Sequence, residues 1–473
     1  MYKSKPITLL KSFSSSNLRD FEKFLHSPYY NKNELLIQLF GILRKEHPAY
    51  EGKNIEREKI YQRLYKDQPF EEPKLRYLFS DFSKLLEQYI MLKELEKNKV
   101  QQNQLLLTYY RTHDIEKYFS QVLDETNKWL EQQNQRDSDY YFYRYLTEES
   151  LYYYSSVRRD KSLDTILQEA ADNLDYYYLS KKLKYLCEMF TRQNFLNSDY
   201  HTPLLKEVTE YVRQSQMDSF PAIQAYYYVL QTLIEEDNES HYNQLLTYLD
   251  QHRQTFSRDE YRDLYFLAQN YCTKRINKGD TRYLNKFLDL SKILLDKELI
   301  YENGYIIPST FKNIVTVGLR LEEFDWVEEF LIKYKDRLAP KYRDNAYTYN
   351  QAWLSFFKGD YRKTLRLLSN VEYMDVYYIL DSKILLLKTY YETEDVDAFY
   401  SLAESFYVYL RRNDLISDYQ KTISLNFVKF VKRLMRIRLG DVKQAELLLS
   451  EIKEKQHVAS ISWLIKKTEQ LIR

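Results

Sequence analysis

The chain has 473 residues, of which 7 are glycine and 9 are proline, far fewer of these turn-forming residues than average usage would supply. This length exceeds the roughly 250–300 residues at which a single compact core stops growing, which leaves several domains or a repeat array. Basic and acidic residues are nearly equal in number, 70 against 69. The ends are mildly basic and the middle is acidic, which argues against a body that binds a polyanion.

The long middle of the chain has almost no residues that could turn a β-hairpin. No glycine occurs between Lys53 and Lys278, and no proline between Lys74 and Thr202. Two-residue hairpins depend on Asn-Gly, Asp-Gly or Gly-X turns. The sequence therefore predicts an all-α protein in which helices hold more than two thirds of the residues and are joined by short polar turns.

Two features bear on the compartment in which the protein works. The two cysteines, Cys187 and Cys272, cannot form a disulfide framework and suit a reducing environment. The segment Met1–Ser16 has no apolar stretch of signal-peptide length. No segment is apolar over the ~18 residues that a membrane helix needs. We expect a cytoplasmic protein with no membrane association.

The first hundred residues hold more than half of the prolines, which cut this segment into short helices. We predict helices near 17–26, 32–46, 55–65 and 74–98. Asn17 followed by Asp20, and Asn31 followed by Glu34, are typical of residues that cap a first helical turn. We interpret residues 1–100 as a separate helical head or cap domain.

From residue 101 a short element recurs: a polar turn, then Asp or Glu, then a helix with apolar residues four and seven positions on. Its phase markers are Asp280, Glu323, Asp360, Asp395 and Asp441, and weaker copies stand at Asp114, Asp160 and Asp237. Each step between markers is long enough for two helices and two turns. Gly359 and Gly440 should lie in the turns between paired helices, where a left-handed residue is easiest for glycine.

The segment Tyr349–Leu368 resembles a tetratricopeptide repeat, with Ala352 on its first helix, a Gly-Asp-Tyr turn, and Leu368 on its second helix. Arg438–Leu449 keeps the alanine that this family places early in the second helix, as Ala445. The pattern departs elsewhere, since Thr364 and Phe399 occupy that alanine position. The resemblance implies a right-handed α-solenoid of divergent helix-turn-helix (TPR-like) repeats over residues 101–473.

The residue patterns of most catalytic and cofactor sites are missing. No two glycines lie within six residues of each other, so neither a P-loop nor a dinucleotide fingerprint can be written. The seven histidines never stand at metal-ligand spacing with each other or with a cysteine. Paired acids such as Glu235-Glu236 suit helix starts better than acid–base chemistry. We expect no enzyme activity, no metal and no cofactor.

Tyrosine is the strongest compositional anomaly, with 49 residues against 24 phenylalanines. Three successive helical residues sweep about 200° of the circumference, so a Tyr-Tyr-Tyr triplet cannot be wholly buried on one face. Two interpretations stand: the rings form a recognition surface, or they serve as amphipathic packing residues of a thin solenoid. As partner-binding residues we predict Tyr141, Tyr145, Tyr152, Tyr153, Tyr154, Tyr176, Tyr177, Tyr178, Tyr226, Tyr227 and Tyr228.

A basic helix is predicted at Lys421–Arg438. Its apolar residues are too numerous for an exposed helix, so its charges should form one outward strip. Either this strip is simply solvated or it contacts an acidic partner. The residues concerned are Lys429, Lys432, Arg433 and Arg436.

The favoured hypothesis is a non-enzymatic scaffold or adaptor that binds a protein or peptide through the Tyr-rich region Tyr140–Tyr228. The alternative is a regulator in which the head binds nucleic acid through a helix-turn-helix in Glu56–Ile90 and the repeats act as a sensor. Arg76 and Lys84 would reach the groove in that case, but Asp81 and Glu87 would come with them, so we expect nucleic-acid binding less than protein binding.

Overall fold

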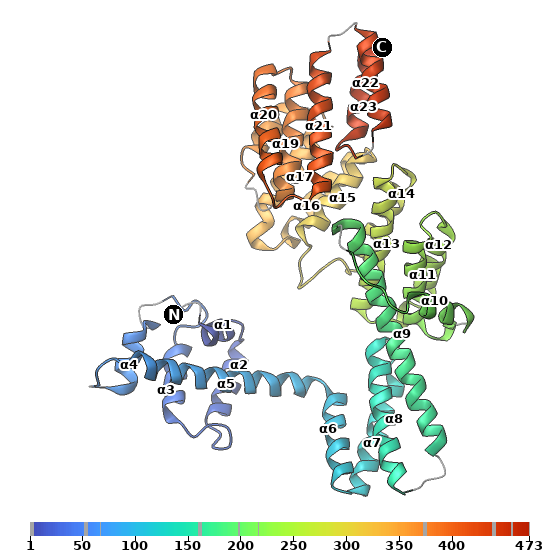
Figure 1. Cartoon of the computed structure of the whole chain (residues 1–473). Coiled ribbons are helices and arrows are strands. Elements are labelled where there is room, and N and C mark those ends of the chain that lie inside the picture. Colours follow the sequence, from blue (N-terminus) through green and yellow to red (C-terminus); the bar gives the residue numbers. More distant parts are fainter. Residues whose placement is uncertain are drawn as a thin grey trace. The chain divides into compact units, whose positions relative to one another are not determined.

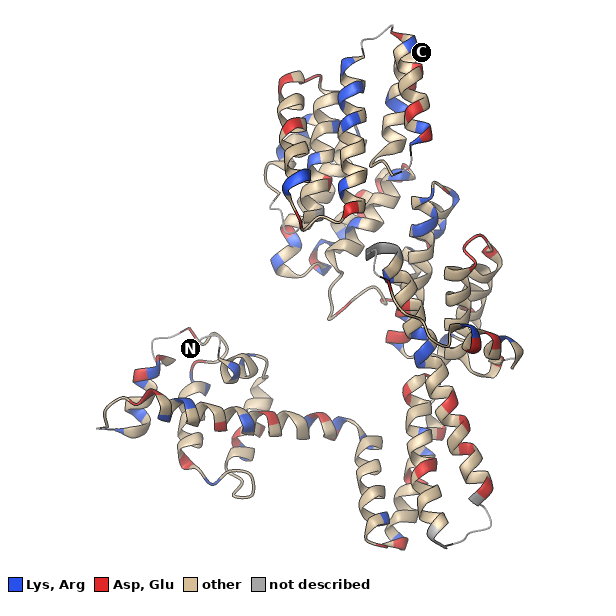
Figure 2. Cartoon of the chain, viewed as in Figure 1, with Lys and Arg blue, Asp and Glu red and all other residues tan. Residues whose placement is uncertain are grey.

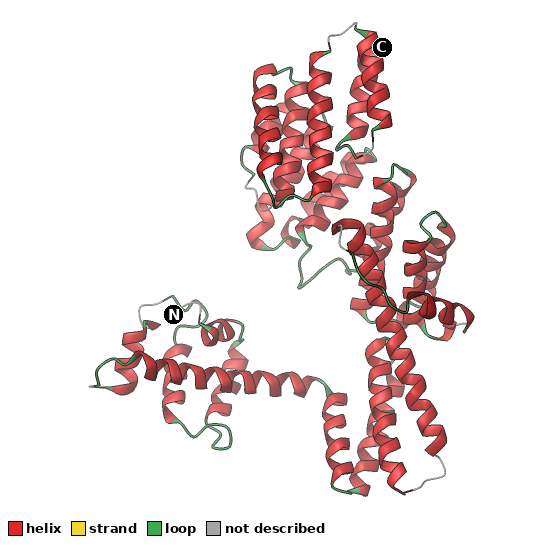
Figure 3. Cartoon of the chain, viewed as in Figure 1, coloured by secondary structure: helices red, strands yellow, loops and turns green. Residues whose placement is uncertain are grey.

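The computed structural model describes residues 4–51, 55–66, 68–158, 163–196, 199–215, 217–371, 376–437, 441–455 and 457–472. Helices account for 80% of the structure, and no strand occurs within these ranges (Figure 3). The prediction of an all-α protein with more than two thirds helix is confirmed. The chain forms two compact units, the first made of Met1–Gln133 and Tyr140–Asp175, the second of Asn134–Asp139 and Tyr176–Arg473.

Among the described residues, nine helices run from the start of the first unit into the second (Figure 1). They are α1 Lys5–Lys11, α2 Ser15–Leu25, α3 Glu34–Arg44, α4 Arg57–Tyr65, α5 Glu72–Lys97, α6 Lys99–Thr112, α7 Glu116–Gln132, α8 Ser138–Arg158 and α9 Leu163–Leu196. The boundaries between the units fall near the start of α8 and within α9.

Helices α1 to α5 enclose their own hydrophobic core. Phe21 lies at its centre, with ring centroids 5.2 Å from Phe40, 5.8 Å from Phe82 and 5.3 Å from Tyr89. The four helices predicted for this segment are present, and α1, which begins at the proline-containing first turn Lys5-Pro6, was missed. The domain boundary near residue 100 stays a prediction, because this core ends at Tyr89 while the first unit continues beyond it.

Both predicted caps in this segment are wrong. Helix α2 is capped by Ser14, whose side chain accepts a hydrogen bond from the backbone N–H of Asn17. Helix α3 is capped by Asn33. Asn31 is buried instead, and its amide donates to the carbonyl of Leu25. In both helices the capping residue is a Ser or Asn that lies two or three residues from the predicted one. The sequence does not distinguish these residues, because each carries a side-chain oxygen that can cap a first turn.

The remaining helices belong to the second unit, together with short 3₁₀ turns at Met217–Ser219, Arg253–Thr255 and Lys335–Arg337. They are α10 Leu205–Gln214, α11 Pro221–Ile234, α12 Glu239–Gln251, α13 Arg258–Asn277, α14 Arg282–Asp296, α15 Pro308–Arg320, α16 Phe324–Tyr334, α17 Pro340–Phe357, α18 Tyr361–Leu368, α19 Val376–Glu392, α20 Val396–Arg412, α21 Asp418–Arg436, α22 Val442–Glu454 and α23 Ile461–Ile472. Successive buried clusters run from Leu179 to Leu354, from Tyr349 to Leu385 and from Leu380 to Leu464. Cys187 and Cys272 are buried and free.

The predicted phase markers coincide with helix starts. Asp360, Asp395 and Asp441 are the N-caps of α18, α20 and α22, and each side chain accepts a hydrogen bond from the backbone N–H three residues on. Glu323 immediately precedes α16, and Asp280 lies two residues before α14. Local capping chemistry therefore places the second helix of each pair.

The prediction that Gly359 lies in a turn between two helices is confirmed. Gly359 has φ +80° and lies in the turn between α17 and α18, where a side chain on Cβ would be strained. Gly440, for which the same prediction was made, lies outside the described residues, as does Asp160, a weaker copy of the phase marker.

Candidate functional site

The predicted tyrosines differ widely in exposure. Tyr226 is 1% exposed and Tyr141 is 4% exposed, so the prediction that these two rings form a partner surface is wrong. Tyr226 is buried because α11 is buried on almost every face. Tyr153 and Tyr178 are the most exposed of the set, at 48% and 39%. The others are half-buried: Tyr145, Tyr152, Tyr154, Tyr176, Tyr177, Tyr227 and Tyr228.

The predicted tyrosine region is also divided between the two units. Tyr152–Tyr154 belongs to the first unit, whereas Tyr176–Tyr178 and Tyr226–Tyr228 belong to the second. We therefore consider the exposed rings of each unit separately.

Three helices of the first unit each expose a tyrosine, and two of these rings contact the same third ring. Tyr109 on α6, Tyr118 on α7 and Tyr153 on α8 are 53%, 50% and 48% exposed. The Tyr110 ring centroid lies 6.0 Å from those of both Tyr109 and Tyr118. The guanidinium of Arg111 lies 5.5 Å from the Tyr153 ring. We call Tyr109, Tyr118 and Tyr153 the tyrosine surface.

Sequence reasoning found only one member of the tyrosine surface. Tyr109 and Tyr118 lie on either side of the turn that joins α6 to α7, outside the dense clusters that drew attention. On α6, Leu107 is buried while Leu105 is 57% exposed. Three successive leucines, Leu105–Leu107, cannot all lie on one face of a helix, and this run is the signal that could have indicated exposed apolar surface on α6.

Figure 2 shows basic residues along α21, where the basic strip was predicted. Two of the four predicted charges form ion pairs with neighbouring helices. Lys432 pairs with Glu404 on α20, and Arg433 makes two hydrogen bonds to the Glu451 carboxylate on α22. Lys429 and Arg436 are exposed. Half of the four charges therefore serve to join α21 to its neighbours, and contact of the strip with an acidic partner stays a prediction.

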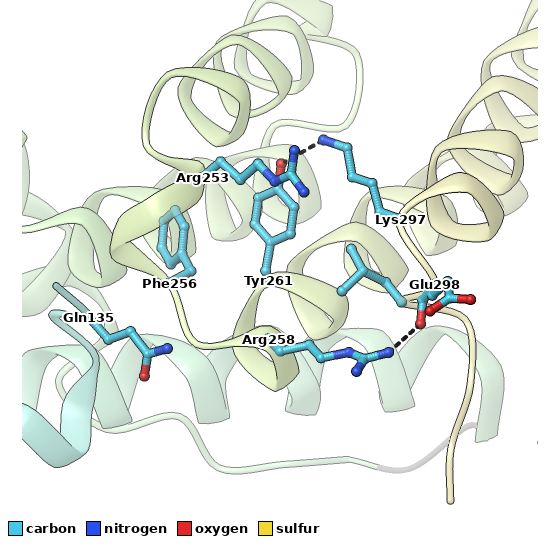
Figure 4. Close-up of a pocket in the computed structure, with 8 residues that line it drawn as sticks. Gln135, Arg253, Phe256, Arg258, Tyr261, Lys297 and Glu298 are labelled. Atoms are coloured by element: carbon cyan, nitrogen blue, oxygen red, sulfur yellow. Dashed lines mark hydrogen bonds between the residues drawn. The ribbon is translucent and has the colours of Figure 1, made fainter. Parts of the chain in front are cut away.

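The second unit contains a cavity of about 390 Å³ at the start of α13 (Figure 4). Its floor includes the rings of Phe256 and Tyr261, which are 4% and 3% exposed. Arg253 and Lys297 reach toward the Tyr261 hydroxyl from opposite sides (Figure 4). The lining residues are Gln135, Arg253, Phe256, Arg258, Tyr261, Lys297, Glu298 and Leu299.

Two of the three cationic groups of this cavity donate hydrogen bonds to neutral oxygens. Lys297 Nζ donates to the Tyr261 hydroxyl at 3.3 Å, and the Arg258 guanidinium donates to the Glu298 backbone carbonyl at 2.6 Å. Within the described ranges, no carboxylate lies at ion-pair distance from Arg253, Arg258 or Lys297. Burial, and then the Arg253 charge, lowers the pKa of Lys297, while Asp250 acts in the opposite direction.

A neighbouring cavity of about 510 Å³ shares Arg258, Glu298 and Leu299 with the first. Its charges are balanced, since Arg258, Arg262 and Arg337 face Asp259, Glu298 and Glu302. The Arg262 guanidinium is already paired with Asp259 at 3.1 Å. The first cavity is the one in which positive charge exceeds negative charge.

Comparisons with known proteins give no family. No family model, no curated protein and no solved structure matches the chain. Across the described ranges, no group of three or more His, Cys, Asp or Glu side chains could hold a metal ion. None of the helices described combines the length and apolar character needed to cross a membrane.

Proposed function

We propose that the chain is a non-enzymatic, cytoplasmic scaffold or adaptor, built from TPR-like helix pairs in a right-handed solenoid, that binds a protein or peptide through the tyrosine surface. The observation that carries this proposal is a set of three exposed rings on α6, α7 and α8: Tyr109 and Tyr118 contact the same Tyr110 ring, and Tyr153 lies against Arg111 of α6.

Close contacts between the paired helices support the repeat assignment. A Cβ added to Gly318 on α15 would lie 2.6 Å from Val327 on α16. In the next pair, the Thr364 hydroxyl on α18 lies 3.4 Å from the Ala352 carbonyl on α17. In both pairs a small residue of the first helix faces the residue four positions after the phase marker. In the tetratricopeptide resemblance, this is the position at which the family places an alanine early in the second helix.

Tyrosine suits a recognition surface for physical reasons. It offers a large contact area at a low cost in side-chain entropy, and its hydroxyl can form a hydrogen bond to the partner. Exposed tyrosine rings are therefore candidates for the few residues that dominate the binding energy of an interface. The buried tyrosines of the second unit, such as Tyr242 at 1% exposed, serve instead as core.

The test compares stability and binding in the same variants. A partner captured from the native cell is titrated against Tyr109→Ala, Tyr118→Ala and Tyr153→Ala, with Tyr77→Ala as a control. Tyr77 is a 65% exposed ring on α5 outside the tyrosine surface. We expect at least one surface variant to lose ~2 kcal/mol or more of binding energy, while its stability changes by less than ~0.5 kcal/mol. If all four variants bind equally, the tyrosine surface is not the interface.

The regulator alternative receives less support from the charges on α5. Lys84 Nζ lies 2.9 Å from the Asp81 carboxylate, and Glu87 pairs with Lys5. A helix that carries these acids into a groove would bring them close to phosphates.

A further inference from the structure

We propose that the 390 Å³ cavity at the start of α13 is a binding site for a phosphate monoester, held between Arg253 and Lys297. This inference does not depend on the proposed function, because the cavity and the tyrosine surface lie in different units.

The charge of the cavity supports an anionic ligand. Three basic side chains, Arg253, Arg258 and Lys297, face a single acid, Glu298. Asp250 influences Lys297 electrostatically, but within the described part of the chain it forms no ion pair with Lys297 or Arg253. Asp250 therefore offsets only part of the repulsion between Arg253 and Lys297, and an anion bound between these two cations converts the remaining repulsion into attraction.

The hydrogen-bonding groups support a phosphate rather than a carboxylate. A phosphate monoester carries a charge of about −1.5 to −2 near pH 7 and presents three acceptor oxygens, whereas a carboxylate carries about −1 and presents two. The cavity offers guanidinium and ammonium donors, and Gln135 adds an amide. Clusters of cationic donors of this kind recognise phosphorylated groups.

The size and the walls of the cavity support an ester rather than the free ion. A volume of about 390 Å³ lies within the range of organic-ligand sites. The buried rings of Phe256 and Tyr261 form an apolar wall that could contact the carbon part of the ligand. The neighbouring 510 Å³ cavity lacks this bias, because its three arginines face three acids.

The experiment measures binding to the full chain by isothermal titration calorimetry. The probes are glycerol phosphate and a short peptide with one phosphoserine, with the unphosphorylated peptide and acetate as comparisons. We expect saturable binding of at least one phosphorylated probe and no binding of the comparisons. Binding of the peptide alone indicates a phosphorylated protein as the source, and binding of both indicates a site for the phosphate ester itself. Affinity should fall below about pH 6, where the second phosphate ionisation is reversed.

Matched variants test whether the phosphorylated probe binds in the cavity. Arg253→Gln and Lys297→Gln should each weaken binding of the phosphorylated probe by roughly tenfold or more. Lys363→Gln and Arg366→Gln, which alter exposed residues on α18, should leave it unchanged. A circular-dichroism melt of each variant checks that it is folded. The proposal is overturned if neither phosphorylated probe binds at millimolar concentration, or if folded Arg253→Gln and Lys297→Gln proteins bind as the parent does.

Discussion

The second unit buries two ionisable side chains of opposite sign in two different surroundings. Glu260 lies in the first turn of α13 and is 7% exposed, and Lys388 lies on α19 and is 3% exposed. Glu260 is surrounded by other charged groups, whereas Lys388 is surrounded by aromatic rings. The contrast shows two ways in which a helical protein can hold a group that water would otherwise keep charged.

The surroundings of Glu260 are polar, but they leave part of its carboxyl unbonded. Two ion pairs lie nearby, Lys184 with Asp263 at 3.1 Å and Lys181 with Asp139 at 3.2 Å. Within the described ranges, Glu260 Oε2 has no hydrogen-bond partner. Burial, followed by the Asp137 carboxylate, raises the pKa of Glu260 from 4.5 to about 8, although both lysines act in the opposite direction.

The surroundings of Lys388 are four rings from two helices. Its Nζ lies 4.9 Å from the ring centroid of Trp353, 4.7 Å from Phe356 and 5.5 Å from Trp463, and Phe357 lies at 5.8 Å. Burial lowers the pKa of Lys388 from 10.5 to about 7, while Glu392 acts in the opposite direction. The ring faces also favour the ammonium form, because each attracts a cation by about 0.5–2 kcal/mol.

These two groups should give the second unit a stability minimum near neutral pH. The contribution of Glu260 to the free energy of unfolding falls as pH rises from 4.5 to about 8, because in that window its carboxyl is ionised in the unfolded chain and protonated in the folded one. The contribution of Lys388 to the free energy of unfolding rises as pH increases from about 7 to 10.5, because in that window its amine is protonated in the unfolded chain and neutral in the folded one. Each group can be replaced alone, so the pH dependence of stability that comes from Glu260 can be measured separately from the one that comes from Lys388.

The largest expected effect is that of Glu260→Gln. Glutamine keeps the shape of the protonated carboxyl and cannot ionise, so the loss of stability between pH 4.5 and about 8 should disappear. The window corresponds to at most ~5 kcal/mol, at about 1.4 kcal/mol for each pH unit. In calorimetric melts from pH 4 to pH 9, the melting temperature of the variant should rise relative to that of the parent as pH increases. A constant difference across this range would mean that Glu260 ionises normally in the folded protein.

Lys388→Met should give a smaller effect with the opposite slope. Methionine fills a similar volume without a charge. The variant should melt above the parent at pH 6, and this advantage should shrink as pH rises toward 10. The total change should be below ~5 kcal/mol, because the four rings recover part of the desolvation cost. An advantage that does not change with pH would show that the rings keep Lys388 charged throughout.

The comparison also shows what a sequence can and cannot predict about these sites. Asp360, Asp395 and Asp441 were found because a cap acts on the backbone three residues away, so the signal is local. The four rings around Lys388 and the lining of the α13 cavity come from residues that are distant in sequence. Arg253 and Lys297 meet only after α13 and α14 have folded. No spacing in the chain links these two residues.

The error at Tyr226 has a different cause. The triplet argument predicts that some ring of Tyr226–Tyr228 lies outside the buried stripe, and Tyr227 and Tyr228 are indeed only half-buried. It does not say which ring is buried. Helix α11 is apolar around most of its circumference, and a helix of that kind is buried on several sides. The composition of the neighbouring residues was therefore a better guide than the triplet.

The smallest expected effect, that of Tyr226→Phe, tests whether the buried Glu260 carboxyl makes no hydrogen bond to the Tyr226 hydroxyl. Within the described part of the chain, the Tyr226 hydroxyl has no hydrogen-bond partner, and the Glu260 charge acts on it only electrostatically. Removing an unbonded buried hydroxyl should change stability by less than ~0.5 kcal/mol and leave the pH slope of Glu260 unchanged.

Tyr248→Phe is the matched control, because the buried Tyr248 hydroxyl donates to the Asp218 carbonyl at 2.9 Å, and its loss should cost ~1 kcal/mol. Melting curves of both variants at pH 5 and pH 8 make the comparison. If Tyr226→Phe is as costly as Tyr248→Phe, or if it moves the pH at which the Glu260 contribution changes, then the hydroxyl is bonded to the Glu260 carboxyl. Glu260 would then be held by a specific partner rather than by burial alone.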